Sequence, residues 1–149
     1  MEWRLRSASE SDREFLYALH CTTMREVIDN TWGWDDVWQR GDFNRRFGMC
    51  AVSIIDIHGR AVGGLWLEAT PNYLHIVELQ LVPEMQGKGI GNAVVQHVIQ
   101  QGIDRGLPVT LLVVPANPRA QRLYERLGFE VTGVEAPFIH MRRAAHSDR

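Results

Sequence analysis

The chain has 149 residues, of which 45% are hydrophobic and 23% are charged, and its formal net charge is −2. This length and composition suit one globular domain with its own core, and the small net charge argues against a general nucleic-acid binder. The sequence contains no run of 18 apolar residues and no apolar signal segment after Met1, so we expect neither a membrane association nor secretion. Cys21 and Cys50 share no motif and are expected to be free thiols in the cytoplasm.

The first third of the chain predicts a short strand and two helices. Trp3 to Arg6 alternates in polarity as a strand does. Ser11 and Glu14 have the spacing of a helix-capping box. Apolar residues then recur at helical intervals, namely Phe15, Leu16, Leu19, Val27 and Ile28. After a break at residues 31–34, a second helix is expected over Asp35–Phe47, with Val37, Trp38 and Phe47 as its apolar positions.

The middle of the chain predicts three strands. Met49–Ile57 and Ala61–Ala69 are expected to form a hairpin, because His58-Gly59 between them is a turn signal. The third strand is expected over Tyr73–Val82.

The last part of the chain predicts two helices and three strands. The first helix is expected from Ile90 to Asp104, where apolar residues recur every three or four positions. Val109–Val114 is a continuous apolar run, which predicts a central strand buried on both faces. Asn117-Pro118 is expected to start the second helix and Gly128 to end it. The closing strands are expected at Phe129–Thr132 and Phe138–Arg142. The last residues, Ala144–Arg149, are polar and are expected to be frayed. This order indicates a mixed α/β fold of one domain, residues 1–149.

The most informative stretch is the turn between the third expected strand and the helix at Ile90. It contains Gly87, Gly89 and Gly91 at alternate positions, and glycines let backbone N–H groups approach a ligand closely. The helix start adds unpaired N–H groups and the positive end of its dipole. The turn is therefore expected to bind a phosphate group. A P-loop is excluded because no Ser or Thr follows Lys88, and a dinucleotide fingerprint fits poorly because its glycine spacing differs.

The string Leu79–Asn92 resembles the acyl-CoA signature of the GNAT superfamily of N-acetyltransferases, L-x-(V/L)-x-P-x-x-Q-G-x-G-I-G. A second string, Asn117–Phe129, resembles the family's second motif, N-x-x-A-x-x-L-Y-x-x-x-G-F. The order of the expected elements also matches this family from end to end. The resemblance therefore implies the acyl-CoA N-acyltransferase fold, with a mixed, mostly antiparallel sheet that is splayed at the cofactor cleft and flanked by about four helices.

The resemblance implies acetyl-CoA (coenzyme A) as the cofactor and assigns roles to individual residues. It implies that the backbone of Leu81 binds the pantetheine or the thioester carbonyl and that Tyr124 protonates the departing CoA thiolate as a general acid. The other residues implied to contact the cofactor are Gln86, Gly87, Lys88, Gly89, Ile90, Gly91, Asn92 and Asn117.

The general base is less well defined. Some relatives that acetylate protein N-termini carry a glutamate five residues before the asparagine, and that position here is Leu112. Glu78 is the first candidate base, followed by Glu68, because both lie on strands that border the expected cleft. His140 on the closing strand is a further candidate. Each of these residues also has an ordinary structural interpretation, as a solvated charge, an ion-pair partner or a strand histidine.

The acceptor is expected to be a small-molecule amine, with a peptide or protein amine as the alternative. Trp32 and Trp34 between the first two helices, together with Glu68, are the candidate substrate residues. For the tryptophans, the alternative of simply covering the core is slightly favoured. No zinc-ligand spacing occurs among the six histidines, so no metal is expected. No G-x-S-x-G nucleophile elbow occurs in the sequence, so direct attack in a ternary complex is favoured over an acyl-enzyme. The alternative function is a non-catalytic acyl-CoA sensor or assembly module, and a homodimer is an option that the sequence leaves open.

Overall fold

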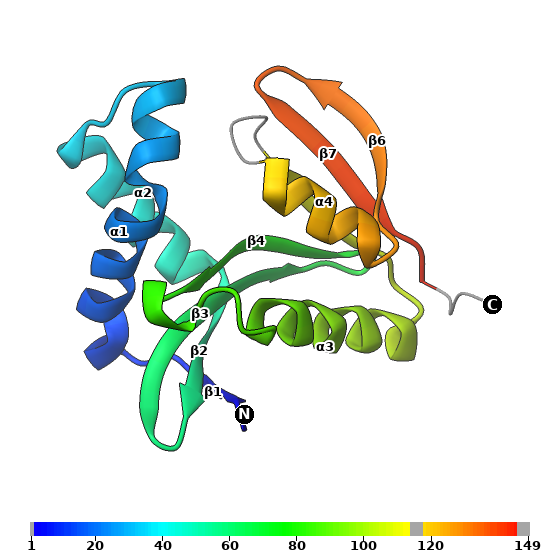
Figure 1. The fold of residues 1–149 in the computed structure, drawn as a ribbon, viewed down its shortest axis with the longest axis horizontal. Coiled ribbons are helices and arrows are strands. Elements are labelled where there is room, and N and C mark those ends of the chain that lie inside the picture. The colour runs from blue at the N-terminus through cyan, green and yellow to red at the C-terminus, as the bar shows by residue number, and fades with distance from the viewer. Residues whose placement is uncertain (1, 114–117, 146–149) are drawn as a thin grey trace. The chain divides into compact units, whose positions relative to one another are not determined.

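The computed structural model describes residues 2–113 and 118–145. Its hydrogen-bonded strand order is β1-β2-β3-β4-β5-β7-β6 (Figure 1). Where their registers are given, neighbouring strands run antiparallel except β4 and β5, which are parallel. The strands are β1 (Arg4–Ser7), β2 (Ala51–Ile57), β3 (Arg60–Ala69), β4 (Leu74–Leu81), β5 (Val109–Val113), β6 (Glu130–Glu135) and β7 (Phe138–Arg143). The helices are α1 (Arg13–Thr31), α2 (Asp36–Met49), α3 (Ile90–Arg105) and α4 (Pro118–Arg126), with single 3-10 turns at Glu10–Asp12 and Pro83–Met85. The predicted mixed, mostly antiparallel fold is confirmed.

The chain divides into two compact units. The first comprises Met1–Leu67 and Glu78–Ile90, and the second comprises Glu68–Val77 and Gly91–Arg149. Strand β4 therefore begins in the second unit and ends in the first. The parallel ladder between β4 and β5 comprises Leu74–Ile76 and Val109–Leu111, while both strands continue beyond it.

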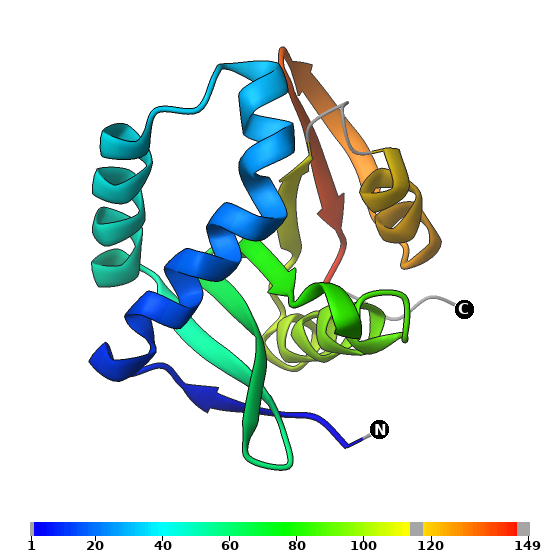
Figure 2. The same cartoon turned by 60° about the vertical axis from the view of Figure 1, so that its left-hand side comes forward.

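In the first unit, α1 and α2 pack on the same face of β3. The side chain of Leu16 on α1 lies against Gly64, and the ring of Phe43 on α2 lies 5.2 Å from that of Trp66, edge to face. Gly64 and Trp66 are two residues apart on one strand, so they share a face. Figure 2 shows both helices beside the β2–β3 hairpin. His58 (φ 51°) and Gly59 (φ 83°) form the predicted tight turn of this hairpin.

In the second unit, α3 provides one apolar face and strands β4, β5 and β7 provide another. The buried helix residues include Val94, Val95, Val98 and Ile99. The buried strand residues alternate along each strand, and they include Leu74, Ile76, Val109, Leu111 and Met141. Near the end of α3, a Cβ on Gly102 would lie 2.6 Å from the carbonyl oxygen of Leu107, so this position requires glycine for the chain to fold back.

The prediction that β5 is buried on both faces is wrong. Val109, Leu111 and Val113 are buried, but Leu112 between them is 39% exposed. The strand therefore alternates in burial with period two, as a half-covered strand does, although its residues are nearly all apolar.

The apolar positions predicted for α2 are also largely wrong. Val37 is 85% exposed and Trp38 is 61% exposed, while Gln39 and Phe43 are buried. Gln39 is tolerated inside because its Oε1 lies 2.9 Å from Nε2 of the buried His20. Since a polar pair occupies part of the buried face, hydrophobicity alone predicts the wrong helix face.

The predicted capping box lies two residues too late. In the structure, the backbone N–H of Ser9 donates to the Asp12 carboxylate at 2.8 Å, so the box is Ser9–Asp12. Arg6 also donates two hydrogen bonds to Asp12, at 2.9 and 3.0 Å, and their effect lowers the pKa of Asp12 to about 2. This additional partner from β1 favours Asp12 over Glu14 as the acidic residue of the cap.

Candidate functional site

The turn that joins β4 to α3 has the geometry that its glycines predicted. Gly87 (φ 75°) and Gly89 (φ 84°) both adopt the left-handed conformation, which side chains with a Cβ rarely adopt. The turn is braced from within, because Gln86 Nε2 donates to the carbonyl oxygen of Leu81 at 3.0 Å. Ile90 is buried and fixes the start of α3.

The backbone of this turn offers hydrogen-bond donors to a ligand. Among the described residues, the N–H groups of Gly87, Lys88 and Gly89 donate no hydrogen bond to the backbone, and all three residues are exposed. Gly91 and Asn92 follow Ile90 in the first turn of α3, where N–H groups have no partner within the helix. Successive free N–H groups beside a helix start make a seat for an anionic group such as a diphosphate.

Tyr124 lies on α4 in the second unit, and the loop after this helix fixes its ring. Gly128 (φ 96°) ends the helix, as predicted, and the N–H of Phe129 donates to the carbonyl oxygen of Tyr124 at 3.0 Å. The Phe129 ring packs edge to face on the Tyr124 ring at 5.6 Å. Burial raises the pKa of Tyr124 above its usual value of 10, so the phenol is protonated at neutral pH. The predicted cofactor residue Asn117 lies outside the described residues.

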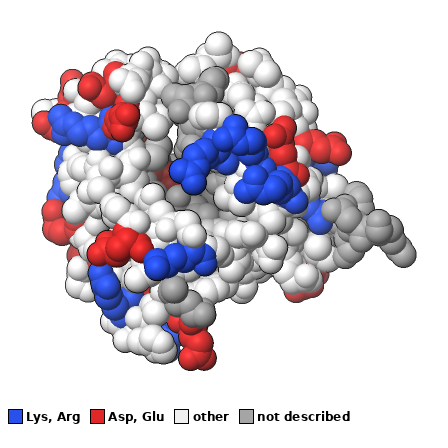
Figure 3. Space-filling view, in the orientation of Figure 1, with Lys and Arg blue, Asp and Glu red and all other residues white. Residues whose placement is uncertain are grey.

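A group of basic side chains covers α4 (Figure 3). Arg119, Arg122 and Arg126 are exposed and follow one another at intervals of three and four residues, which places them on one side of the helix. Sequence analysis missed this group because a net charge near zero hides a local basic surface. Its signal was the helical spacing of the three arginines.

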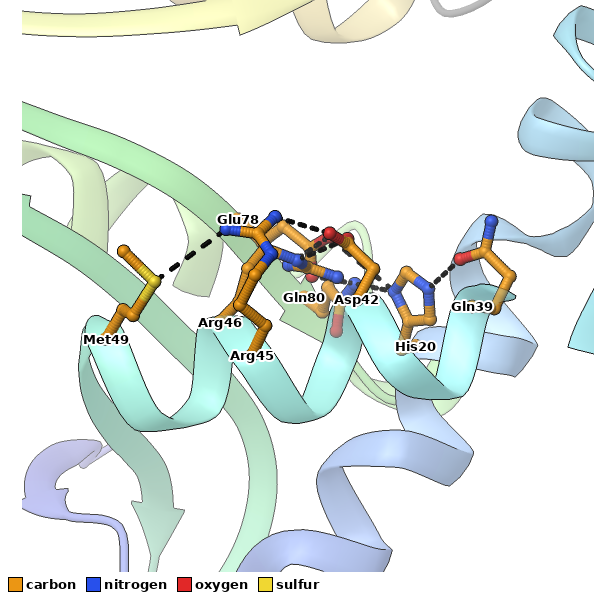
Figure 4. A network of polar contacts seen from close by, with 8 residues as sticks. All are labelled: His20, Gln39, Asp42, Arg45, Arg46, Met49, Glu78 and Gln80. Carbon is orange, nitrogen blue, oxygen red and sulfur yellow. Dashed lines mark hydrogen bonds and ion pairs between the residues drawn. The ribbon is translucent and has the colours of Figure 1, made fainter. Parts of the chain in front are cut away.

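Glu78, the first candidate base, lies within a network of polar side chains in the first unit (Figure 4). Its Oε1 lies 2.8 Å from Arg46 Nη1, at ion-pair distance, and its Oε2 accepts a hydrogen bond from Gln80 Nε2 at 2.8 Å. The third neighbour is His20, whose Nδ1 lies 3.6 Å from Glu78 Oε1. Both carboxylate oxygens of Glu78 are already taken up by these partners, so the contacts suit a positioning role better than general-base catalysis.

The same contacts change the ionisation of His20. Burial alone would lower the pKa of this imidazole, but the hydrogen bond and charge of Glu78, together with the hydrogen bond of Gln39, outweigh burial and raise it. Arg46 opposes the rise by its charge. These four side chains come from α1, α2 and β4, so no local pattern in the sequence brings them together.

The three residues predicted to contact the substrate lie in surroundings that differ from one another. Trp32 is 53% exposed. Trp34 is half-buried; its Nε1 donates to Asp36 at 2.6 Å, and Arg25 lies over its ring at 5.0 Å. Glu68 is exposed, belongs to the second unit and lines a cavity there. Glu68 and Glu78 thus belong to different units, as do Glu68 and the two tryptophans.

A mixed sheet whose fourth strand leads through a glycine turn into a helix, with a partly buried tyrosine on the next helix, defines the class of acyl-CoA N-acyltransferases. The family model described as "Acetyltransferase (GNAT) family" matches residues 13–129, and the chain belongs to this family. Coenzyme A or its acetyl ester is therefore the expected cofactor of this chain.

The chain is similar to two curated relatives, both mycothiol acetyltransferases, and to several solved structures. It is 30% identical over 94 residues to a mycothiol acetyltransferase of Thermomonospora curvata; the match covers 62% of this chain and 32% of the relative. The PaiA N-acetyltransferase of Thermoplasma acidophilum, solved in complex with coenzyme A, is 16% identical with a TM-score of 0.78, over 97% of this chain and 99% of that one. The ribosomal-protein-S18-alanine N-acetyltransferase of Escherichia coli is 18% identical with a TM-score of 0.70, over 99% of this chain and 97% of that one.

The chain spans about a third of the length of the Thermomonospora curvata relative, and at these identities the solved structures establish the fold. Within the described residues, no helix is both long enough and apolar enough to cross a bilayer.

Proposed function

We propose that this protein is an N-acetyltransferase that moves the acetyl group of acetyl-CoA to a primary amine of a small molecule, by direct attack in a ternary complex. The observation that carries the proposal is the exposed turn at Gly87–Gly89, with two left-handed glycines and backbone N–H groups that donate no hydrogen bond to the described backbone. The family match over residues 13–129 supports it.

The residues of the turn fit coenzyme A. A diphosphate needs several donors converging from the main chain, and the turn with the start of α3 provides them through Gly87–Asn92. Lys88, the only lysine of the chain, adds a positive charge to the turn. The backbone of Leu81, with its carbonyl oxygen already bound by Gln86, is proposed to hold the pantetheine arm. The arginines of α4 attract phosphate groups through their charge.

Tyr124 is proposed as the general acid. When bound, acetyl-CoA supplies an activated acetyl thioester, whose thiolate needs a proton as it leaves. A phenol that burial keeps protonated is suited to donate that proton. Asn117 is proposed as a further cofactor contact from the family motif.

The test separates binding from turnover. Calorimetry with acetyl-CoA measures binding, and release of free thiol in the presence of an amine panel measures turnover. Tyr124→Phe is expected to lower kcat at least tenfold while the Kd for acetyl-CoA stays within threefold of the wild-type value. Tyr17→Phe, which removes the same hydroxyl from α1 in the first unit, is the matched control and should retain wild-type kcat.

Three results would contradict parts of the proposal. No heat of binding with acetyl-CoA would overturn it entirely. Tight binding without turnover of any amine would favour the acyl-CoA sensor or assembly module instead. Turnover of peptide N-termini but of no small amine would favour a peptide or protein acetyltransferase.

A further inference from the structure

The second unit contains a cavity of about 330 Å³ whose residues come from five strands or their ends. Its floor is formed by the sheet face opposite the apolar one. His75 on β4 is paired with Thr110 on β5, and Thr110 is paired in turn with Arg142 on β7. The next pair on the same face is Leu112 with His140. Side chains alternate along each strand, and Leu111 and Met141 are buried on one face. The paired residues named above therefore share the other face, and all of them line the cavity.

Side chains of both charges line the cavity, and both are exposed. Glu68 lies at the end of β3, and Arg142 lies on β7. Among the described residues, neither side chain has an ion-pair partner. A carboxylate and a guanidinium that face one cavity without pairing are complementary to a ligand that carries an ammonium and a carboxylate.

His75 is held in one orientation by a neighbouring hydroxyl. Its Nδ1 lies 2.8 Å from Oγ1 of Thr110. When Nδ1 carries the proton and donates to Thr110, Nε2 keeps its lone pair and can accept a proton from a bound amine. The charges that face the ring agree with this role: burial lowers the pKa of His75, Glu68 partly opposes the change, and His140 adds to it. The imidazole is therefore neutral at pH 7.

We infer that this cavity is the acceptor site, that it takes a small zwitterionic amine of the α-amino acid class, and that His75 is the proton acceptor. The inference rests on the proposed acetyltransferase function. The amine binds towards Glu68 and the carboxylate towards Arg142. The acceptor enters as an ammonium, and two of its protons are lost overall. His75 accepts one and passes it to solvent, and the other leaves the nitrogen for solvent once the N–C bond has formed. The departing thiolate gains a proton from Tyr124, which recovers its own from solvent, so one proton is released overall. The N–C bond forms as the C–S bond breaks.

The inference assigns the base to His75 in place of Glu78. The two candidates differ in their partners. Glu78 lies against the guanidinium of Arg46, whereas His75 is neutral, is oriented by Thr110 and opens to a cavity. His140 lines the same cavity. Its substitution therefore tests whether any histidine on this face can serve as the proton acceptor.

The experiment compares variants of the full chain with a panel of amino acids and the corresponding decarboxylated amines. His75→Asn is expected to lower kcat at least 100-fold, with the Kd for acetyl-CoA unchanged by calorimetry. Arg142→Gln is expected to raise KM for amino acids at least tenfold and to remove the preference over decarboxylated amines. His58→Asn, at the turn of the β2–β3 hairpin, is the matched control; its left-handed φ also suits asparagine.

A binding measurement makes the inference independent of turnover. Proton–carbon NMR of the histidine rings, assigned through His75→Asn, should show the His75 signals shifting when an amino acid of the panel is added to the wild-type protein with CoA. If the protein binds acetyl-CoA but no amino acid shifts these signals, the acceptor site is wrong while the proposed function stands. Wild-type kcat in His75→Asn, with full loss in His140→Asn, would also overturn the role of His75.

Discussion

Arg46 Nη1 lies 2.8 Å from Glu78 Oε1, and both side chains are largely buried. The Arg46 guanidinium also lies 5.4 Å from the centre of the Trp66 ring, and its Nε donates to Asp42 at 2.9 Å. Arg46 therefore joins α2 to β3 and β4 within the first unit. A paired charge in this setting is costly to leave alone, because its partner has already given up its hydration.

We predict that Arg46→Gln destabilises the protein by about 3 kcal/mol, the usual cost of removing one partner of a buried ion pair. Urea unfolding followed by circular dichroism measures the change. Arg45→Gln is the matched control, since Arg45 is the next residue on α2, is mostly exposed and pairs with Asp42 alone among the described carboxylates. We expect it to cost less than about 1 kcal/mol. Equal costs for the two variants would show that the Arg46–Glu78 pair contributes little.

The raised pKa of His20 predicts a dependence of stability on pH. A base whose pKa is higher in the folded state than in the unfolded state stabilises the fold fully below its unfolded value of about 6.5. That contribution is lost as the pH rises through the folded-state pKa of His20. Glu78→Gln removes the main causes of the rise, and burial then lowers the pKa instead. The difference in unfolding free energy between wild type and Glu78→Gln should therefore be larger at pH 6 than at pH 8.5.

Urea unfolding of both proteins at the two pH values measures this difference. Subtracting the variant's unfolding free energy from that of the wild type cancels the contribution of titratable groups that the variant does not affect. His20→Gln should behave like Glu78→Gln in its pH dependence, because it removes the titrating ring itself. A difference that is constant between pH 6 and pH 8.5 would mean that His20 does not titrate in contact with Glu78.

Close packing at Gly63 gives a second structural prediction. A Cβ at this position on β3 would lie 2.3 Å from the carbonyl oxygen of Gln80 and 2.9 Å from a methyl group of Leu81. Since a backbone oxygen cannot move without shifting β4, Gly63→Ala should destabilise the protein by roughly 2–3 kcal/mol. Gly41→Ala on α2 is the control, because nothing lies within 4 Å of its Cβ, and it should stabilise the helix by up to about 1 kcal/mol. Thermal unfolding should show opposite shifts in Tm; a lower Tm for both variants would contradict this account.

The features that the sequence predicted correctly depend on residues close together in the chain. The hairpin at His58-Gly59 and the end of α4 at Gly128 follow from local backbone preferences, and the structure confirms both. The wrong face of α2 has the opposite origin. Its buried side includes Gln39 and Arg46, whose partners lie on α1 and β4, so their burial depends on contacts that hydrophobicity does not encode.

The same distinction applies to the candidate site. The turn proposed to bind the diphosphate is a continuous string of residues, so its motif could be read directly from the sequence. The cavity that we propose as the acceptor site is assembled from separate strands, and the strand register brings His75, Thr110 and Arg142 into one row. Glu68 and His140 were recognised one by one in the sequence, but nothing in it indicated that they line a common cavity with His75.

The glycines of the turn give the sharpest prediction about the cofactor. Gly89 has φ 84° and open space around its Cβ position, so Gly89→Ala meets no steric clash and acts only through the backbone. An alanine in this conformation costs about 1–2 kcal/mol, and relaxation of the turn would redirect the N–H groups of Lys88 and Gly89. We expect the Kd for acetyl-CoA to rise at least tenfold, as measured by calorimetry.

Gly59→Ala is the matched control for this prediction. Gly59 has nearly the same φ, 83°, and equally open space, but it lies in the β2–β3 hairpin. The two variants should therefore lose similar stability, while only Gly89→Ala loses affinity for acetyl-CoA. If both variants bind acetyl-CoA as tightly as the wild type, the main chain around Lys88 does not hold the diphosphate, and the basic face of α4 becomes the alternative to test by Arg122→Gln.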